Sequence, residues 1–245
     1  VAMVRSRQTL GSLLARAAAV HGGSVLVDQA AEARTGVPAT KLTVAGAAKL
    51  VDRWAAALVE DDKISAGDRV VLAMPNSVEL FLATLAVSRA GAIPAPVNDA
   101  MRDDEIAHVV LDANAPLVIR GVDELDVLAE HLGVSAGLGE DRGADERVAA
   151  LFYTSGTTGS PKGAALTHRA LVGELSRLAA LPGGLLICEL LIALPVAHIF
   201  GFAALAAAAS AGVPVRFRPR FRPTECLDDI EERRSAAFAG VPTMY

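Results

Sequence analysis

The sequence "YTSGTTGSPKG", from Tyr153 to Gly163, has the composition of a loop and directly follows the apolar run "AALF". It contains three glycines, five serine or threonine residues, one proline and one lysine. Backbone N–H groups and hydroxyls in such a loop point into one concavity and favour an anion. Lys162 adds a cation, and a charge-assisted hydrogen bond contributes about 1.5–3 kcal/mol. A flexible connector is the alternative for a loop of this composition, but this arrangement predicts a phosphate-binding site.

Two common nucleotide-binding patterns do not fit this loop. A Walker A loop has the pattern G-x-x-x-x-G-K-[ST], whereas here Pro161 precedes Lys162 and Gly163 follows it. The glycines also do not form the G-x-G-x-x-G pattern of dinucleotide-binding folds. The spacing therefore argues against a P-loop NTPase and against a dinucleotide-binding enzyme.

The sequence on both sides of the loop alternates between helix and strand patterns. Upstream, Thr43 precedes apolar residues at the 3.6-residue period, and "RVVLAM" (69–74) is a short β-branched strand. Downstream, strands are predicted at "GAALT", "LLIALP", "VPVRF" and "AAFAGV", with helices between them at 168–181, 202–211 and 224–234. Strands that are apolar on both faces and alternate with helices indicate an α/β fold with parallel sheets covered by helices.

The same alternation suggests how the chain is divided. Residues 133–147 are rich in Gly, Asp and Glu and contain few apolar residues. We predict a loop or linker there, between a first α/β subdomain (1–132) and a second one (148–245) that carries the phosphate loop.

The composition argues against several classes of protein. With 52% hydrophobic residues and a mean hydropathy of +0.40, the 245-residue chain is predicted to fold around a core. A net charge of −5 gives no electrostatic reason to expect nucleic acid as a partner. Cys188 and Cys226 form no CxxC pair, so neither a zinc site nor a disulfide framework is predicted. Reduced thiols favour a cytoplasmic location.

Two apolar stretches require separate interpretation. In the N-terminal stretch, Arg16 interrupts the apolar run that a signal peptide would need, and the apolar residues fall at helical spacing. We predict an amphipathic surface helix capped by Thr9. The stretch Leu190–Val215 contains no Asp, Glu, Lys or Arg, but Pro195, His198 and Gly201 divide it. We predict a buried strand followed by a buried helix there, and no transmembrane segment.

Several motifs resemble those of one family of enzymes. The loop, followed by "LTH" (166–168), resembles the phosphate-loop signature of the adenylate-forming superfamily, which includes acyl-CoA synthetases, luciferases and peptide-synthetase adenylation domains. Further matches follow in the family's order: "GDRVVLAMPNSVELFLATLAVSRAGAIPAPVN" (67–98), "ALPVAHIFGF" (193–202) and "FAGVPTMY" (238–245). The second of these is similar to the family's "LP-x-x-H-x-x-G" motif. The residues of these motifs are most similar to those of the acyl-CoA synthetases, which are acid–thiol ligases.

The resemblance implies a two-step reaction. A carboxylate, expected to be a fatty or other hydrophobic acid, attacks the α-phosphate of ATP and forms an acyl-adenylate and pyrophosphate. The thiol of coenzyme A then displaces AMP. Such chemistry depends on positioning and on spreading the phosphate charge. The residues implied to bind the β- and γ-phosphates are Thr154, Ser155, Gly156, Thr157, Thr158, Gly159 and Lys162.

The remaining roles also come from the resemblance. Thr154 would help to hold Mg²⁺, and Lys162 and His198 would be the catalytic residues in this part of the chain. The acyl pocket would include His198, Gly240 and Val241. Ala197 stands where the family usually has a bulky residue, so the pocket beside His198 is expected to be wider or to be filled from elsewhere.

Other polar residues have simpler interpretations. A histidine in an apolar run is often a satisfied core residue, and His198 is assigned to the site because of the motif around it. His168 is predicted to be structural, next to a capping Thr167. The basic run Arg216–Pro223 could bind a phosphate or coenzyme A, but a solvated turn between strand and helix is the favoured prediction.

The chain departs from the family in length. The family's Tyr-Gly-x-Thr-Glu segment, ribose-binding aspartate and C-terminal catalytic lysine have no counterpart in these residues. We therefore expect the 245 residues to be the N-terminal part of such an enzyme and to be inactive, or nearly so, alone. Two alternatives stay open: a fatty-acyl-AMP ligase that loads an acyl carrier protein, and a truncated, non-catalytic binding module.

Overall fold

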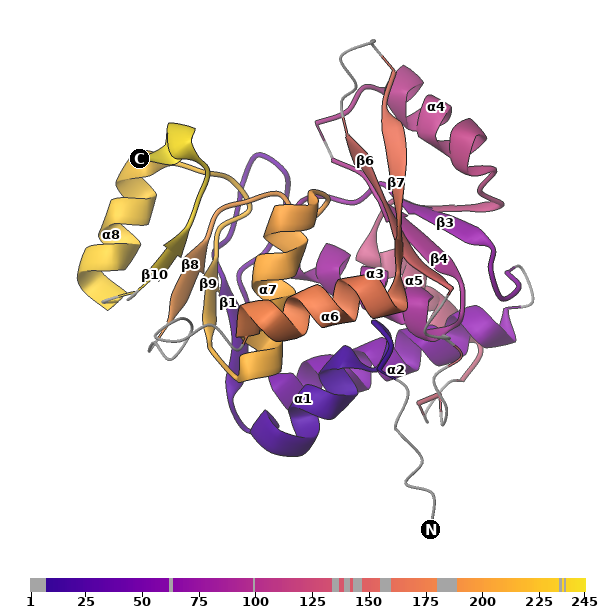
Figure 1. The fold of residues 1–245 in the computed structure, drawn as a ribbon, viewed down its shortest axis with the longest axis horizontal. Coiled ribbons are helices and arrows are strands. Elements are labelled where there is room, and N and C mark those ends of the chain that lie inside the picture. Colours follow the sequence, from indigo (N-terminus) through magenta and orange to yellow (C-terminus); the bar gives the residue numbers. More distant parts are fainter. Residues whose placement is uncertain are drawn as a thin grey trace.

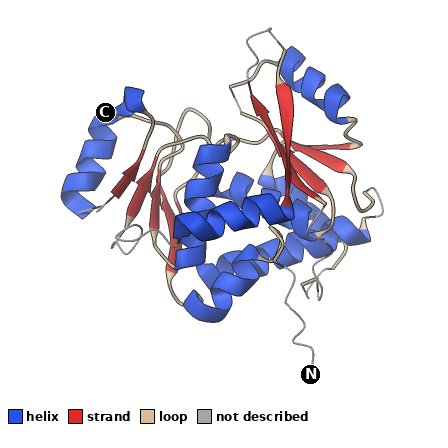
Figure 2. Cartoon of the chain, viewed as in Figure 1, coloured by secondary structure: helices blue, strands red, loops and turns tan. Residues whose placement is uncertain are grey.

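The computed structural model describes residues 8–61, 64–98, 100–133, 137–138, 142, 147–154, 160–179, 189–233, 235 and 237–245. Within them helices and strands alternate, which confirms the predicted α/β fold class with mostly parallel sheets (Figures 1 and 2). The helices are α1 (Leu13–His21), α2 (Val44–Glu60), α3 (Val78–Arg89), α4 (Asp103–Ala113), α5 (Val122–His131), α6 (His168–Ala179), α7 (Ile199–Ala211), α8 (Pro223–Arg233) and the 3-10 turn η1 (Pro242–Met244). The strands are β1 (Val25–Gln29), β2 (Thr40–Thr43), β3 (Arg69–Leu72), β4 (Ile93–Pro96), β5 (Leu117–Ile119), β6 (Val148–Thr154), β7 (Lys162–Thr167), β8 (Leu190–Ile192), β9 (Val215–Phe217) and β10 (Ala237–Ala239).

The strands form three hydrogen-bonded groups. A five-stranded sheet has the order β10-β8-β9-β1-β2, and its strands are parallel except for the β1–β2 pair. A parallel three-stranded sheet has the order β4-β3-β5. β6 and β7 form an antiparallel hairpin that lies against β4. Figure 1 shows the five-stranded sheet on one side and the other strands on the opposite side, with α3 and α7 between them.

A cluster of aromatic side chains connects the two sides of the molecule. The ring of Phe202 on α7 packs against Phe81 of α3 and Phe152 of β6, with centroids 5.3 and 5.4 Å away. All three side chains are almost completely buried. α3 is buried along nearly its whole length, as expected for a helix that is covered on all sides. One core therefore supports both groups of strands and fixes the position of α7 relative to the β6–β7 hairpin.

The helix predicted after Thr43 is α2, and the Thr43 hydroxyl caps it by accepting the N–H of Gly46. The hydroxyl of Ser77 caps α3 in the same way, by accepting the N–H of Leu80. The apolar stretch 190–215 forms the predicted buried strand and helix, β8 and α7. In the described part of the chain, no helix combines the length and the apolar character that a membrane span requires. The predicted cap of the first helix is wrong in detail, because Thr9 accepts the N–H of Ser12 in a turn that precedes α1.

The predicted linear subdomains do not correspond to separate sheets. β1, from the first predicted subdomain, pairs with β9 of the second, so that Val27 lies beside Val215 and Gln29 beside Phe217. The strand β1 was missing from the sequence prediction altogether. One of its two neighbours, β2, follows it directly in the chain, but the other, β9, comes from near the opposite end. A short strand is stabilised mainly by such cross-strand contacts. The loop predicted at 133–147 lies mostly outside the described residues.

The prediction of a solvated turn at Arg216–Pro223 is wrong for its first two arginines. Arg216 donates to Asp28 Oδ1 at 2.6 Å and to Asp229 Oδ1 at 3.1 Å. Arg218 donates to Asp229 and to Glu225. These arginine side chains are only 15% and 12% exposed. The two guanidinium groups therefore attach α8 to the five-stranded sheet instead of facing solvent.

Candidate functional site

The β6–β7 hairpin places two of the predicted phosphate-binding residues opposite each other. Thr154 is the last residue of β6, Lys162 is the first residue of β7, and the two are partners in the strand register. Both side chains are exposed. The other predicted phosphate-binding residues, Ser155, Gly156, Thr157, Thr158 and Gly159, lie outside the described residues.

The glycine that ends the motif leaves room for the ring of Tyr153 on the opposite strand. A Cβ on Gly163 would lie 2.9 Å from Cζ of Tyr153, its partner across the hairpin. The tyrosine ring therefore occupies the space beside the Gly163 backbone, and any larger residue would have to displace it. The close pairing of Thr154 with Lys162 follows in the next position of the same ladder.

His198 has a defined position at the start of α7. It is the N-cap residue of this helix, and its Nδ1 accepts the N–H of Phe200 at 3.2 Å. Because Nδ1 acts as an acceptor, the proton of the neutral ring lies on Nε2, which can donate a hydrogen bond. The side chain is exposed, so the interpretation of His198 as a satisfied core histidine does not hold. His168, in contrast, is buried, and its Nδ1 accepts the N–H of Leu10, which confirms its structural assignment.

A buried asparagine from another motif holds the segment that precedes His198. Asn76, in the "MPNS" turn, accepts the N–H of Val196 at 2.8 Å and donates to the carbonyl oxygens of Leu194 and Pro219 at 3.4 and 2.7 Å. The Pro195 carbonyl in turn accepts the N–H of His198 at 3.1 Å. Asn76 was not predicted as a site residue. A polar residue between two apolar elements was the available signal, because a buried asparagine needs hydrogen-bond partners and therefore holds a neighbouring segment in place.

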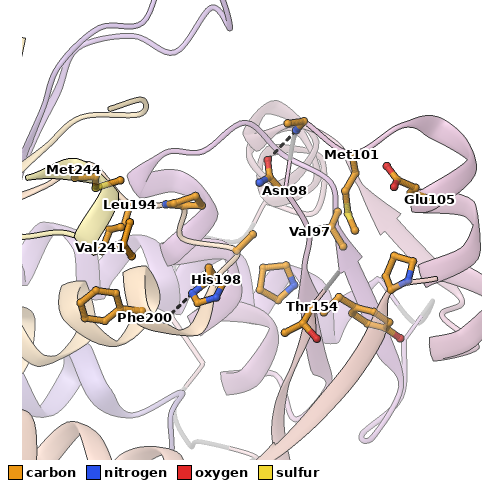
Figure 3. Close-up of a pocket in the computed structure, with 16 residues that line it drawn as sticks. Val97, Asn98, Met101, Glu105, Thr154, Leu194, His198, Phe200, Val241 and Met244 are labelled. Atoms are coloured by element: carbon orange, nitrogen blue, oxygen red, sulfur yellow. Dashed lines mark hydrogen bonds between the residues drawn. The ribbon is translucent and has the colours of Figure 1, made fainter. Parts of the chain in front are cut away.

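Thr154 and His198 line one cavity of about 460 Å³, whereas Lys162 is not among its lining residues. Figure 3 shows Thr154 and His198 at this cavity, together with Val97, Asn98 and Met101 from the segment after β4. Most of its lining is apolar, with a few polar groups at defined positions, which is typical of a small-molecule site. The lining consists of Pro96, Val97, Asn98, Ala100, Met101, Glu105, Tyr153, Thr154, Pro161, Leu194, Pro195, Ala197, His198, Phe200, Val241 and Met244.

The predicted acyl-pocket residues are only partly brought together. His198 and Val241 line the cavity, whereas Gly240 is not among its lining residues. A Cβ on Gly240 would instead contact the rings of Phe238 and Tyr245. Ala197, beside which the pocket was expected to be wider or to be filled from elsewhere, is part of the lining, and so is Phe200.

The residues around the hairpin fit a magnesium-bound polyphosphate in their chemistry. Thr154 presents an exposed hydroxyl, and Lys162 presents an exposed ammonium group at the same end of the hairpin. Mg²⁺ takes few ligands from a protein and shares the phosphate oxygens and water, so one hydroxyl is a suitable partial contribution. Among the residues that the structure describes, no group of three or more His, Cys, Asp or Glu side chains could hold a metal ion independently.

Comparison with known proteins identifies the family. The model of the AMP-binding enzymes matches residues 14–245, and the chain belongs to this family. The long-chain-fatty-acid–CoA ligase FadD13 of Mycobacterium tuberculosis is 30% identical over 204 residues, which cover 74% of this chain and 41% of the ligase. A 4-chlorobenzoate–CoA ligase of Arthrobacter sp is 34% identical over 206 residues, covering 72% of this chain and 38% of the relative. The chain therefore spans less than half the length of these relatives.

Solved structures show the same fold. The inhibitor-bound N-terminal domain of FACL13 from Mycobacterium tuberculosis superimposes with a TM-score of 0.81 at 24% identity, over 97% of this chain and 64% of that one. The complex of VinN with 3-methylaspartate gives a TM-score of 0.82 at 20% identity, over 97% of this chain and 68% of VinN. These structures show that the fold is that of the N-terminal domain of adenylate-forming enzymes. The family match and the relatives above confirm the predicted membership of the superfamily.

Proposed function

We propose that this chain forms the ATP- and acid-binding part of an ATP-dependent acyl-CoA synthetase. The observation that carries the proposal is a shared cavity. Thr154 and Pro161, near the two ends of the phosphate-loop motif, line the same apolar cavity as His198. A polyphosphate at the hairpin and a carboxylic acid in the cavity would therefore be neighbours, as adenylate formation requires.

The residues have separate roles in the proposed first step. A carboxylate oxygen forms a bond to the α-phosphorus of ATP while the bond to the bridging oxygen breaks, and pyrophosphate leaves with that electron pair. Lys162 and the hydroxyl of Thr154 spread the charge of the phosphates. Thr154 would also contribute one oxygen to Mg²⁺, which would neutralise further charge when bound. His198 donates its Nε2–H to an oxygen of the carboxylate or of the acyl-adenylate. Coenzyme A then supplies the thiol that displaces AMP.

The cavity also supports a class of substrate. Its lining is dominated by apolar side chains such as Val97, Met101 and Val241, which favour a hydrophobic acyl group. Relatives of this chain include ligases named for long-chain fatty acids and for 4-chlorobenzoate. We propose a fatty or other hydrophobic carboxylic acid as the substrate.

The proposal is tested by the acid-dependent exchange of labelled pyrophosphate into ATP, measured on the complete gene product. Lys162→Ala is expected to slow the exchange about 10- to 100-fold, because a charge-assisted hydrogen bond contributes about 1.5–3 kcal/mol. Thr154→Ala should also slow it. Lys49→Ala is the matched control, since Lys49 is an exposed lysine on α2 that does not line the cavity. Unchanged exchange in both Lys162→Ala and Thr154→Ala would contradict the proposed role of the hairpin.

The exchange assay, combined with a measurement of acyl transfer to coenzyme A or to an acyl carrier protein, distinguishes two alternative functions. The 245-residue chain alone is proposed to be inactive or nearly so, and robust exchange by this chain would contradict that proposal. If the complete protein forms acyl-adenylate but transfers the acyl group only to an acyl carrier protein, the fatty-acyl-AMP ligase is correct. If it binds ATP and forms no adenylate, a non-catalytic module is correct.

We also propose a cytoplasmic location. Cys226 is a free, buried cysteine, and burial raises the pKa of its thiol, so that it is an unreactive core residue. A reduced compartment is compatible with such a residue. Fluorescence microscopy of the complete tagged protein would test the location.

A further inference from the structure

One helix is hydrogen-bonded to the phosphate-loop motif near both of its ends. On α4, the Oδ2 of Asp112 accepts the hydroxyl of Tyr153 at 2.8 Å. One turn earlier on the same helix, Nε2 of His108 lies 3.2 Å from the carbonyl oxygen of Pro161. A carbonyl oxygen can only accept, so His108 donates from Nε2. Tyr153 immediately precedes Thr154, and Pro161 immediately precedes Lys162.

The geometry of a helix explains how two side chains reach both strands. Residues at positions i and i+4 lie on one face, with Cβ atoms about 5–6 Å apart. Paired strands are about 4.7–4.9 Å apart, so one helical turn beside a hairpin can contact each of its strands. Figure 1 shows α4 alongside the β6–β7 hairpin.

The helix itself is fixed to the rest of the molecule. The guanidinium of Arg69, on β3, donates to the carbonyl oxygens of Ala113 and Asn114 at the end of α4, at 2.6 and 3.1 Å. Buried apolar residues of α4 pack in one cluster with the ring of Tyr153 and with Val71 of β3; they are Ile106, Val109 and Ala113. The hydrogen bonds from α4 therefore connect the hairpin to a helix that Arg69 holds at its C-terminal end and that the apolar cluster holds along its buried face.

The hydrogen bond from the Tyr153 hydroxyl to Asp112 is largely shielded from solvent on the tyrosine side. The Tyr153 side chain is only 9% exposed. Burial, together with the hydrogen bond to the Asp112 carboxylate, raises the pKa of the Tyr153 hydroxyl, which stays a protonated donor at physiological pH. A hydrogen bond to a charged carboxylate is stronger than one between neutral groups.

We propose that His108 and Asp112 are positioning residues that hold Thr154 and Lys162 in the arrangement that binds the phosphates of ATP. The inference rests on the proposed function of the hairpin. It does not depend on contact between α4 and the nucleotide: His108 and Asp112 act through Pro161 and Tyr153. A displacement of about 1 Å in a positioned group can cost roughly 100-fold in rate, so small movements of the hairpin matter.

The test separates the binding of ATP from the binding of the acid in the complete gene product. H108L and D112A each remove one hydrogen bond at a residue that does not line the cavity, and each is expected to raise the KM for ATP about threefold or more while the KM for the acid is unchanged. H108Q keeps an N–H donor and is expected to recover most of the loss seen in H108L. L111A is the control on the same helix, since Leu111 is 80% exposed, and it should change neither KM.

The outcomes distinguish this inference from the proposed function. If the wild-type protein shows no ATP–pyrophosphate exchange, the proposed function fails and the inference fails with it. If the wild type is active and Lys162→Ala slows it, but H108L and D112A leave the KM for ATP unchanged, only the inference is wrong. Equal changes in both KM values together with a lowered melting temperature would show a general structural role and would also overturn the inference.

Discussion

Gly201→Ala is expected to lower the stability of the protein by about 1–3 kcal/mol, the usual cost of overpacking, and to reduce adenylate formation. Gly201 lies in the first turn of α7, where an added Cβ would overlap the carbonyl oxygen of Pro195 and would lie 3.1 Å from the Leu194 Cβ. The Pro195 carbonyl accepts the N–H of His198, so a shift that makes room for the methyl group also moves His198. This explains why the glycine of the "LP-x-x-H-x-x-G" pattern stands three residues after the histidine.

The same substitution in another helix provides a matched control. Gly173 lies in α6, and a Cβ built there would meet no atom within 4 Å. Alanine is favoured over glycine inside a helix by about 0.5–1 kcal/mol, so Gly173→Ala should stabilise the protein. Urea unfolding of both variants, with pyrophosphate exchange as the second measurement, tests the prediction. A shift of the same sign in both variants, with normal exchange in Gly201→Ala, would contradict it.

The local part of the site was predictable from sequence because its signals are contiguous. The motif from Tyr153 to Gly163 predicts that Thr154 and Lys162 belong to one loop, and the structure places them opposite each other in the hairpin. The roles of these residues and of His198 stay predictions until they are tested. The arrangement of His198 and Thr154 around one cavity could not be read from spacing, because it depends on the packing of α7 against β6 through Phe202 and Phe152.

The part of the fold that the sequence did not predict depends on partners that are distant in the chain. β1 pairs with β9, and Asn76 holds the segment around Pro195, although each partner is more than one hundred residues away. The basic run shows the same limitation in its electrostatics. Arg216 lies in β9 and Arg218 directly follows the end of that strand, so that the sequence shows the two arginines only as neighbours in a basic run. Their acidic partners come from β1 and α8, and only the folded structure brings them together.

Asp229→Asn is expected to cost about 1–3 kcal/mol of unfolding free energy, because each of two largely buried guanidinium groups loses one of its two carboxylate partners, leaving Arg216 with Asp28 and Arg218 with Glu225. Asp229 is 5% exposed and accepts hydrogen bonds from the guanidinium groups of both Arg216 and Arg218. Asparagine has the same shape, but it has no charge and directs an NH₂ group or a neutral oxygen at two cations.

The neighbouring residue on α8 provides the control for this prediction. Asp228 is exposed, and Asp228→Asn should change the unfolding free energy by no more than about 0.5 kcal/mol. Urea unfolding of both variants at about 0.1 and 1 M salt separates a buried charge from a surface charge, since salt screens the surface interaction much more strongly. A small, salt-sensitive effect at Asp229, equal to that at Asp228, would mean that the ion pairs of α8 do not hold this helix to the five-stranded sheet. A large and salt-insensitive loss would mean that Arg216 and Arg218 are committed to the fold and are not available to bind a phosphate or coenzyme A.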